Sequence, residues 1–360
     1  MRYIRFLKTP RVVANGKTGR SEVYSLITIT SDLGDSFLPY DVELFAELLS
    51  AKAPEQLLIW RTVHWTSGTR SLPVTFPLPK ALASSSLRLR VGVEPKARHD
   101  EYERLSDDGH RGIVSAWSAE FSVSVEAVKL VERRFTVARD QHLSIWEETG
   151  ESIARHLWDA GITLSCHLKE LLHPQQKPDS ALFPLPRKTT LQALELGTGC
   201  GIVGISLSQI NQGAQVLLTD LPEAQEIIER NIKETNTLDR STLQFQELDW
   251  EVELPENLLS PARPLDLVLA ADCTYNADSR THQYSPALVN TIRRLATVSP
   301  KLIVAIAMKM RHSSEGVFFD LMLAAGFRET QKFAYPLPGD VEVGEEIVYV
   351  HVYRYNSGSG

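Results

Sequence analysis

Cysteine is scarce in this 360-residue chain, which contains only Cys166, Cys200 and Cys273. Three cysteines are too few for a disulfide framework, and none belongs to a C-x-x-C pair, so a structural zinc site is not expected. The ten histidines also lack H-E-x-x-H or another metal-ligand spacing, and we predict no metal site. This use of cysteine suits a reducing compartment and favours a cytoplasmic protein.

Long apolar runs are also missing. No run approaches the ~18 consecutive apolar residues that a membrane-spanning helix needs, and the N-terminal residues lack the apolar core of a secretory signal. The hydrophobic content of 43% is that of an ordinary globular protein. We therefore expect a soluble protein of about two domains that does not bind a membrane.

Negative charge is concentrated in the second part of the chain. Residues 1–140 hold 20 Lys and Arg against 17 Asp and Glu, whereas residues 141–360 hold 18 against 28. An acidic surface disfavours extended contact with phosphates, so we do not expect a nucleic-acid partner. The acidic charge could attract a protein partner with a basic surface, or it could belong to an ordinary solvated surface that has no partner.

The residue pattern changes near residue 140. Before it, alternating or β-branched runs such as SEVYSLITIT and SLRLRVGVEP are separated by turns, which predicts a β-rich domain over residues 1–138. Within this domain, residues 41–54 have helical spacing and predict one helix. Apolar residues from 145 to 171 recur with helical spacing and predict one or two amphipathic helices.

Strand-like and helix-like segments then alternate. This order predicts a doubly wound α/β domain with a mainly parallel sheet over residues 139–356. The last two strand-like runs, RETQKFAYPL and EEIVYVHVYRY, leave no room for a crossover helix and should pair antiparallel. Residues 357–360 are expected to form a flexible tail.

The segment LELGTGCGIVGI places a glycine-rich turn between an apolar strand and a helix. Gly199, Gly201 and Gly204 fit the G-x-G-x-x-G pattern of dinucleotide-binding proteins, and Asp220 ends the next strand about 20 residues on. Glycines let a ligand approach the backbone, and an acidic residue at the second strand accepts hydrogen bonds from ribose hydroxyls. The pattern fits a nicotinamide dinucleotide or another nucleoside cofactor, and a plain tight turn is the structural alternative.

Glu195 separates the two cofactor classes. It puts a carboxylate at the strand end, where a dinucleotide would bring its pyrophosphate, and two anions repel each other. S-adenosylmethionine has no phosphate and carries an ammonium and a sulfonium group, which an acidic rim attracts. The pattern E-L-G-x-G-x-G with a terminal hairpin resembles the class I methyltransferases, which implies a Rossmann-like seven-stranded sheet and S-adenosyl-L-methionine as cofactor.

Four further stretches resemble one branch of that class, the family-16-type protein-lysine methyltransferases. They are LWDAGITLSCHL, LTDLPE, ELDW and LAADCTY, and the resemblance spans residues 145–354. It implies a cytoplasmic enzyme that methylates a lysine of a protein substrate. Residues 1–138 lie outside the resemblance, but the presence of an extra N-terminal domain resembles fungal members acting on translation elongation factors. An elongation factor is therefore one candidate substrate and the domain a candidate docking module.

The resemblance also implies roles for single residues. The loop glycines would line the methionine moiety and the ribose, Asp220 would hold the ribose hydroxyls, Trp250 would pack on the adenine, and Trp158 would close the pocket. Either tryptophan could instead be core, and Asp249 could cap a turn. The implied cofactor-binding residues are Trp158, Glu195, Gly197, Gly199, Gly201, Asp220, Leu221, Asp249, Trp250 and Ala271.

Asp272 and Tyr275 form the D-x-x-Y signature that the resemblance assigns to the reaction. The aspartate would lie where the acceptor lysine meets the sulfonium, and the tyrosine would bound that channel, although Cys273 and Thr274 replace the usual aliphatic pair. A lysine amine is mostly protonated at pH 7, and an ordinary aspartate is a poor base for it. Asp272 is therefore expected to position the amine by hydrogen bonding, unless it is a structural cap.

Other functions stay open on these patterns. The chain could methylate a small molecule or another side chain such as histidine, could bind the cofactor without turnover, or could be an oxidoreductase. The sequence D-C-T-Y in place of N-P-P-Y disfavours nucleic-acid methylation. The target lysine, the number of methyl groups and the oligomeric state do not follow from the patterns.

Overall fold

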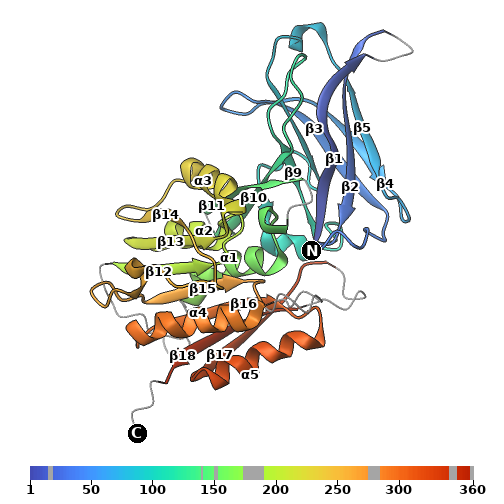
Figure 1. The fold of residues 1–360 in the computed structure, drawn as a ribbon. Helices are drawn as coiled ribbons and strands as arrows, with labels where there is room; N and C mark the ends of the chain where they lie inside the picture. Colours follow the sequence, from blue (N-terminus) through green and yellow to red (C-terminus); the bar gives the residue numbers. More distant parts are fainter. Residues whose placement is uncertain are drawn as a thin grey trace. The chain divides into compact units, whose positions relative to one another are not determined.

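The computed structural model describes residues 1–14, 19–138, 141–149, 153–172, 190–274, 284–339 and 347–356. The chain divides into two compact units (Figure 1). The first consists mainly of Met1–His156, and the second begins at Leu157.

The first unit is built from two mainly antiparallel sheets. One has the strand order β5-β2-β1-β8, and the other has the order β11-β10-β9-β6-β3-β4 with the short β7 beside β10. The strands are β1 (Arg2–Ala14), β2 (Ser21–Thr30), β3 (Val42–Ser50), β4 (Leu57–Trp65), β5 (Leu72–Pro77), β6 (Leu87–Gly92), β7 (Asp100–Glu101), β8 (Ile113–Val114), β9 (Ala116–Ser118), β10 (Leu130–Ala138) and β11 (Gln141–Glu148).

The helix predicted within residues 41–54 is wrong, because the segment forms β3. This strand pairs antiparallel with β4 and β6, and its alternate residues Leu44, Ala46 and Leu48 are fully buried. The opposite face of β3 also carries buried apolar side chains such as Leu49, so the apolar residues do not follow a simple alternation. Pairing on both sides of the strand outweighs the apparent helical spacing.

The helix predicted from residue 145 also begins later. Ile145 lies in β11, opposite Arg133 of β10, and the first α-helix, α1, is Asp159–Leu172. The predicted domain boundary after residue 138 falls between the two strands of the β10–β11 hairpin. Because backbone hydrogen bonds join these strands, both belong to the first unit.

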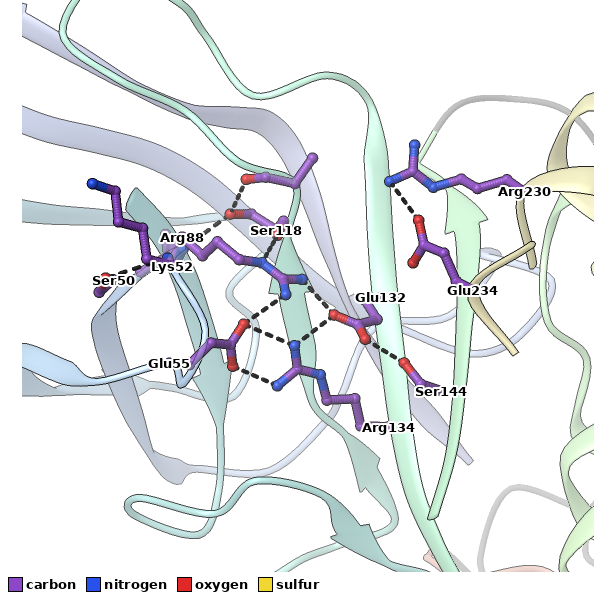
Figure 2. A network of polar contacts seen from close by, with 12 residues as sticks. Ser50, Lys52, Glu55, Arg88, Ser118, Glu132, Arg134, Ser144, Arg230 and Glu234 are labelled. Atoms are coloured by element: carbon purple, nitrogen blue, oxygen red, sulfur yellow. Dashed lines mark hydrogen bonds and ion pairs between the residues drawn. The ribbon is translucent and has the colours of Figure 1, made fainter. Parts of the chain in front are cut away.

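Arginine and glutamate side chains form a network in the larger sheet of this unit (Figure 2). Arg88 binds Glu55 at 2.7 Å and Glu132 at 2.5 Å, and Arg134 binds both carboxylates at 2.7 Å. Burial alone raises the pKa of Glu132, but the hydrogen bond from Arg134 and the charges of Arg88 and Arg134 lower it to about 2. The positive charges of Arg88 and Arg134 thus neutralise the negative charges of Glu132 in β10 and of Glu55 in the segment between β3 and β4.

The second unit contains a seven-stranded sheet with the order β14-β13-β12-β15-β16-β18-β17. The strands from β14 to β16 are parallel, and β18 is antiparallel to both β16 and β17. This confirms the predicted fold with its terminal antiparallel hairpin. The strands are β12 (Leu191–Leu196), β13 (Ala214–Asp220), β14 (Thr242–Glu247), β15 (Leu267–Ala271), β16 (Ile303–Lys309), β17 (Phe327–Pro336) and β18 (Ile347–Tyr355).

Helices cover both faces of this sheet, and the strand order reverses at β12. Leu194 and Leu196 of β12 belong to the core that includes Leu288 of α4 and Phe318 of α5. Helix α1 contacts β15, β16 and β18, and helix α2 contacts the strands from β12 to β15. Since β13 and β15 flank β12, the carboxyl ends of β12 and β15 form a topological switch point, where open α/β sheets bind ligands. The helices after α1 are α2 (Ile202–Ile210), α3 (Gln225–Glu234), α4 (Tyr284–Val298) and α5 (Val317–Ala324).

Candidate active site

The glycine-rich loop follows β12 and has a backbone that only glycine adopts easily. Gly197, Gly199 and Gly201 have φ values of +61°, +56° and +84°. A Cβ atom on Gly197 would lie 2.6 Å from Sγ of Cys273 and 3.2 Å from the ring of Trp250. The loop therefore passes directly against the segments that follow β14 and β15.

Glu195 lies beneath this loop rather than on its rim. Its side chain is buried, and Oε2 accepts the backbone N–H of Gly204 in the first turn of α2 at 2.7 Å. Burial raises the pKa of Glu195 to about 8, although the hydrogen bond from Gly204 opposes the rise. The residue thus occupies a helix amide that a phosphate could otherwise use. Glu195 therefore disfavours a dinucleotide by using the N–H of Gly204, and not by the repulsion between its carboxylate and the pyrophosphate that the sequence led us to expect.

Asp220 joins the tip of β13 to the glycine loop. Its Oδ2 accepts the N–H of Gly199 at 2.7 Å, and its Oδ1 accepts the N–H of Leu221 at 2.8 Å. Burial raises the pKa of Asp220, and the two hydrogen bonds counter that rise. Leu221, which is 42% exposed, places its side chain where a ligand on this edge could reach it.

Trp250 and Asp249 follow β14 and differ in their contacts. The Trp250 ring lies against Gly197, and its buried Nε1 has no hydrogen-bond partner among the residues that the structure describes. A buried N–H without a partner is unfavourable unless a ligand or water completes it. Asp249 accepts the N–H of Glu251 at 2.8 Å, which is the turn-capping contact foreseen as its structural alternative.

Asp272 follows β15 with a φ of +53° and is held by four donors. Its oxygens accept backbone N–H groups from Ala160 at 3.2 Å and Lys309 at 3.1 Å. The Arg311 guanidinium donates to both oxygens, at 3.1 and 3.0 Å. Ala271, the last residue of β15, accepts a contact from Sγ of Cys273 through its carbonyl oxygen at 3.2 Å.

Tyr275, the second residue of the predicted signature, lies outside the described residues.

The W-D-A stretch at the start of α1 meets the end of β16. The ring centroid of Trp158 is 5.4 Å from the guanidinium carbon of Arg311, and the carboxylate of Asp159 lies 2.7 Å from Nζ of Lys309. Ala160 supplies the N–H bound by Asp272. Sequence reasoning missed Asp159, Lys309 and Arg311. One signal was present, because Lys309 ends and Arg311 follows a strand that is parallel to β15, so both lie at the ligand-binding edge.

The described site is built from backbone and ion-pair contacts. In the ranges that the structure covers, no three His, Cys, Asp or Glu side chains are grouped to hold a metal ion. Nor does any helix of those ranges combine the length and apolarity needed to span a bilayer. Among the predicted residues, Gly197 adjoins Trp250 and Cys273, Gly199 is bound by Asp220, and Arg311 links Trp158 to Asp272.

A family model described as "Lysine methyltransferase" matches residues 138–325. A UPF0665 family protein of Schizosaccharomyces pombe is 27% identical over 330 residues, covering 89% of this chain and 92% of that protein. EEF1A lysine methyltransferase 3 of Xenopus tropicalis is 28% identical over 47% of this chain and 65% of its own length. Protein-lysine N-methyltransferase EFM6 of Saccharomyces cerevisiae is 29% identical over 49% of this chain and 73% of that protein.

Proposed function

Because this chain belongs to the lysine methyltransferase family and is an S-adenosyl-L-methionine-dependent methyltransferase, we propose that it methylates a lysine side chain of a protein substrate. The main support is the contact between Cys273, the residue after Asp272, and the glycine loop. Sγ of Cys273 lies 3.4 Å from the carbonyl oxygen of Leu196 and fills the space beside Gly197. The residue that follows Asp272 therefore adjoins the loop assigned to the cofactor.

The loop and its neighbours fit the cofactor. Gly197 keeps the loop backbone bare where a Cβ would meet Cys273 and Trp250, Asp220 lies at the adjacent strand tip, and Trp250 presents a buried N–H that lacks a described partner. These residues would hold S-adenosyl-L-methionine. When bound, it supplies a methyl group activated by its positively charged sulfonium.

The chain's own residues must then receive and orient the lysine. An ordinary lysine amine has a pKa near 10.4, so its deprotonation at pH 7 costs about 4–5 kcal/mol. Trp158 offers an aromatic face to a cationic side chain. Asp272 is fixed by four donors, so its contribution is orientation and charge rather than uptake of the proton.

We also propose a translation elongation factor as the substrate and the cytoplasm as the site of action. The support for the substrate is the similarity to the Xenopus enzyme whose name contains EEF1A. The three free cysteines suit a reducing compartment.

We assign substrate docking to the first unit, most of which lies outside the family match. Trp60 of the edge strand β4 is 51% exposed, and exposed tryptophans are frequent anchors of protein interfaces. Trp60→Ser should raise KM for a folded acceptor and leave methylation of a short acceptor peptide unchanged. An equal effect on both acceptors would argue against docking.

The function is tested with methyl-labelled S-adenosyl-L-methionine in an extract of cells that lack the protein. We expect one labelled protein band that carries methyl-lysine by mass spectrometry, strongly reduced with Asp272→Asn. Asp239→Asn, at an exposed position, serves as the control. Label confined to small molecules or to another side chain would identify a different acceptor, and cofactor binding without any label would contradict catalysis.

A further inference from the structure

Arg311 contacts Asp272, which the sequence assigned to the acceptor lysine, and Trp158, which it assigned to closing the pocket. It forms a two-point ion pair with Asp272, and its guanidinium lies over the ring of Trp158. The side chains of the ion pair are shielded, with 14% of Arg311 and 3% of Asp272 exposed. An ion pair that is shielded from water interacts more strongly than one at the surface.

The four donors leave Asp272 little capacity for a fifth. A carboxylate offers about four lone-pair sites, and two backbone N–H groups and both Arg311 nitrogens already use them. An incoming lysine would have to displace one of these donors to bind the carboxylate directly. The Asp272–Arg311 pair therefore acts on the lysine amine mainly through its charges, and less through a new hydrogen bond between the amine and Asp272.

Three further ionisable side chains or pairs surround the Asp272–Arg311 pair, and each is either paired with an opposite charge or has a pKa raised by burial. Asp159 of α1 pairs with Lys309 of β16, and both side chains are buried. Glu315, in the 3-10 helix Ser313–Gly316, has its pKa raised by burial, an effect opposed by the backbone N–H and the charge of Arg311. Burial also raises the pKa of the Cys273 thiol well above its usual value, so the thiol stays neutral.

Building on the proposed function, we propose that Arg311 is a positioning residue that sets the charge of the acceptor pocket, by which we mean the surroundings of Asp272, Trp158 and Arg311. It neutralises Asp272 and fixes its orientation, so that the pocket receives lysine as the neutral amine and does not retain it as an ammonium ion.

The physical reason is the opposite effect of the two charges on the amine. A nearby carboxylate without a counter-ion stabilises ammonium and raises the amine pKa, whereas a nearby guanidinium lowers that pKa. Only the neutral amine has the lone pair that accepts a methyl group. With Arg311 in place, the lysine loses its proton to water more readily. Without it, Asp272 would bind the ammonium form more tightly and slow the reaction.

The test compares Arg311→Met, which removes the charge, with Arg311→Lys, which keeps the charge and loses the two-point geometry. Arg230→Met, which breaks the Arg230–Glu234 pair on α3, is the control. The acceptor is the protein that the wild type labels in the extract. The kcat and the KM for the acceptor are measured from about pH 6 to pH 10, the range in which a perturbed lysine amine titrates.

We expect Arg311→Met to lower kcat about tenfold near neutral pH and to shift the rising limb of the profile about one pH unit upward. The acceptor KM should stay the same or fall, and calorimetry should show cofactor affinity within about threefold of wild type, well under a tenfold change. Arg311→Lys keeps the positive charge, so the rising limb of its kcat–pH profile should lie at the same pH as in the wild type. Arg311→Gln replaces the Met variant if that variant does not fold.

Two failures are distinguishable. An unshifted limb in the neutral variant, or a rise in KM that accounts for the whole loss, would show that Arg311 is only structural, while lysine methylation would stand. Absence of labelled lysine with the wild type would overturn the proposed function and this inference together.

Discussion

Two buried ion-pair networks in this protein use the same chemistry in different surroundings. In the first unit, Arg88 and Arg134 bind two glutamates within a paired sheet (Figure 2). In the second unit, Asp272 binds Arg311 just beyond the end of β15, and its backbone has a φ of +53°. The first network ties strands together, whereas the second lies at the edge where this kind of sheet binds ligands.

The difference shows how a stabilising network can be separated from one that serves a reaction. A positive φ at a non-glycine residue costs on the order of 1–3 kcal/mol and persists only when its surroundings hold it. Four donors hold Asp272 in this way. We therefore expect changes in the first network to affect stability and changes in the second to affect turnover.

The largest effect on stability is expected from Glu132→Gln. Loss of this charge leaves the guanidinium groups of buried Arg88 and partly buried Arg134 with one carboxylate, and breaking a buried pair lowers the free energy of unfolding by about 3 kcal/mol. Denaturant titration measures this change.

The contribution of Glu132 should also depend on pH. Its pKa is about 2 in the folded protein against an ordinary value of 4.5. The lowered pKa stabilises the fold fully above pH 4.5, and this stabilisation is lost as the pH falls toward 2. Parallel stability profiles for wild type and Glu132→Gln across this interval would contradict the assignment.

Asp272→Asn should lower turnover on the order of a hundredfold, because it weakens the pair with Arg311 and misplaces the acceptor pocket. Cofactor affinity should change by less than about threefold, since Asp272 does not contact the loop glycines in the described contacts. Calorimetry beside the labelled assay separates the two quantities. Equal losses of affinity and turnover would refute this separation.

Gly197→Ala should weaken cofactor binding about tenfold, equivalent to 1.4 kcal/mol. The new Cβ would lie 2.6 Å from Sγ of Cys273 on a backbone with a φ of +61°. The same substitution in a Cys273→Ala background should restore part of the affinity. Gly68→Ala is the matched control, because its φ is +83° and open space surrounds it. A similar loss of affinity in that control would exclude a local effect.

The smallest effect is expected from Trp250→Phe, which removes an N–H without a partner among the described residues. Cofactor affinity should fall about threefold, in the range of one modest hydrogen bond. The melting temperature of the free protein should fall only slightly, because no described hydrogen bond is lost and only part of the ring that packs against the core is removed. Unchanged affinity would show that the indole N–H does not meet the cofactor.

The sequence predicted the second unit well because its signals are local. Strands and helices alternate there, and the glycine pattern falls between β12 and α2, so both the fold and the loop followed from spacing. The orientation of Glu195 was also open to prediction. Leu194 and Leu196 belong to the core beside α4 and α5, so the residue between them must point toward α2.

The remaining features depend on contacts between distant segments. β3 was misread as a helix because Phe45 and Leu49 on its second face break the simple alternation, and only pairing with β4 and β6 defines it as a strand. Arg311 lies 39 positions from Asp272. Nothing in their spacing reveals the pair, because it forms only when β15 and β16 align in parallel.

The distinction between the two networks is tested most directly by the kcat of Asp272→Asn and of Glu132→Gln. Both are measured side by side at saturating cofactor, and each kcat is divided by the concentration of folded protein. We predict that Asp272→Asn loses most of its turnover on methyl-lysine formation, while Glu132→Gln, a change in the first unit, stays within about twofold of wild type, or about 0.4 kcal/mol. Equal losses in the two variants, or a larger loss in Glu132→Gln, would contradict the distinction between the two networks.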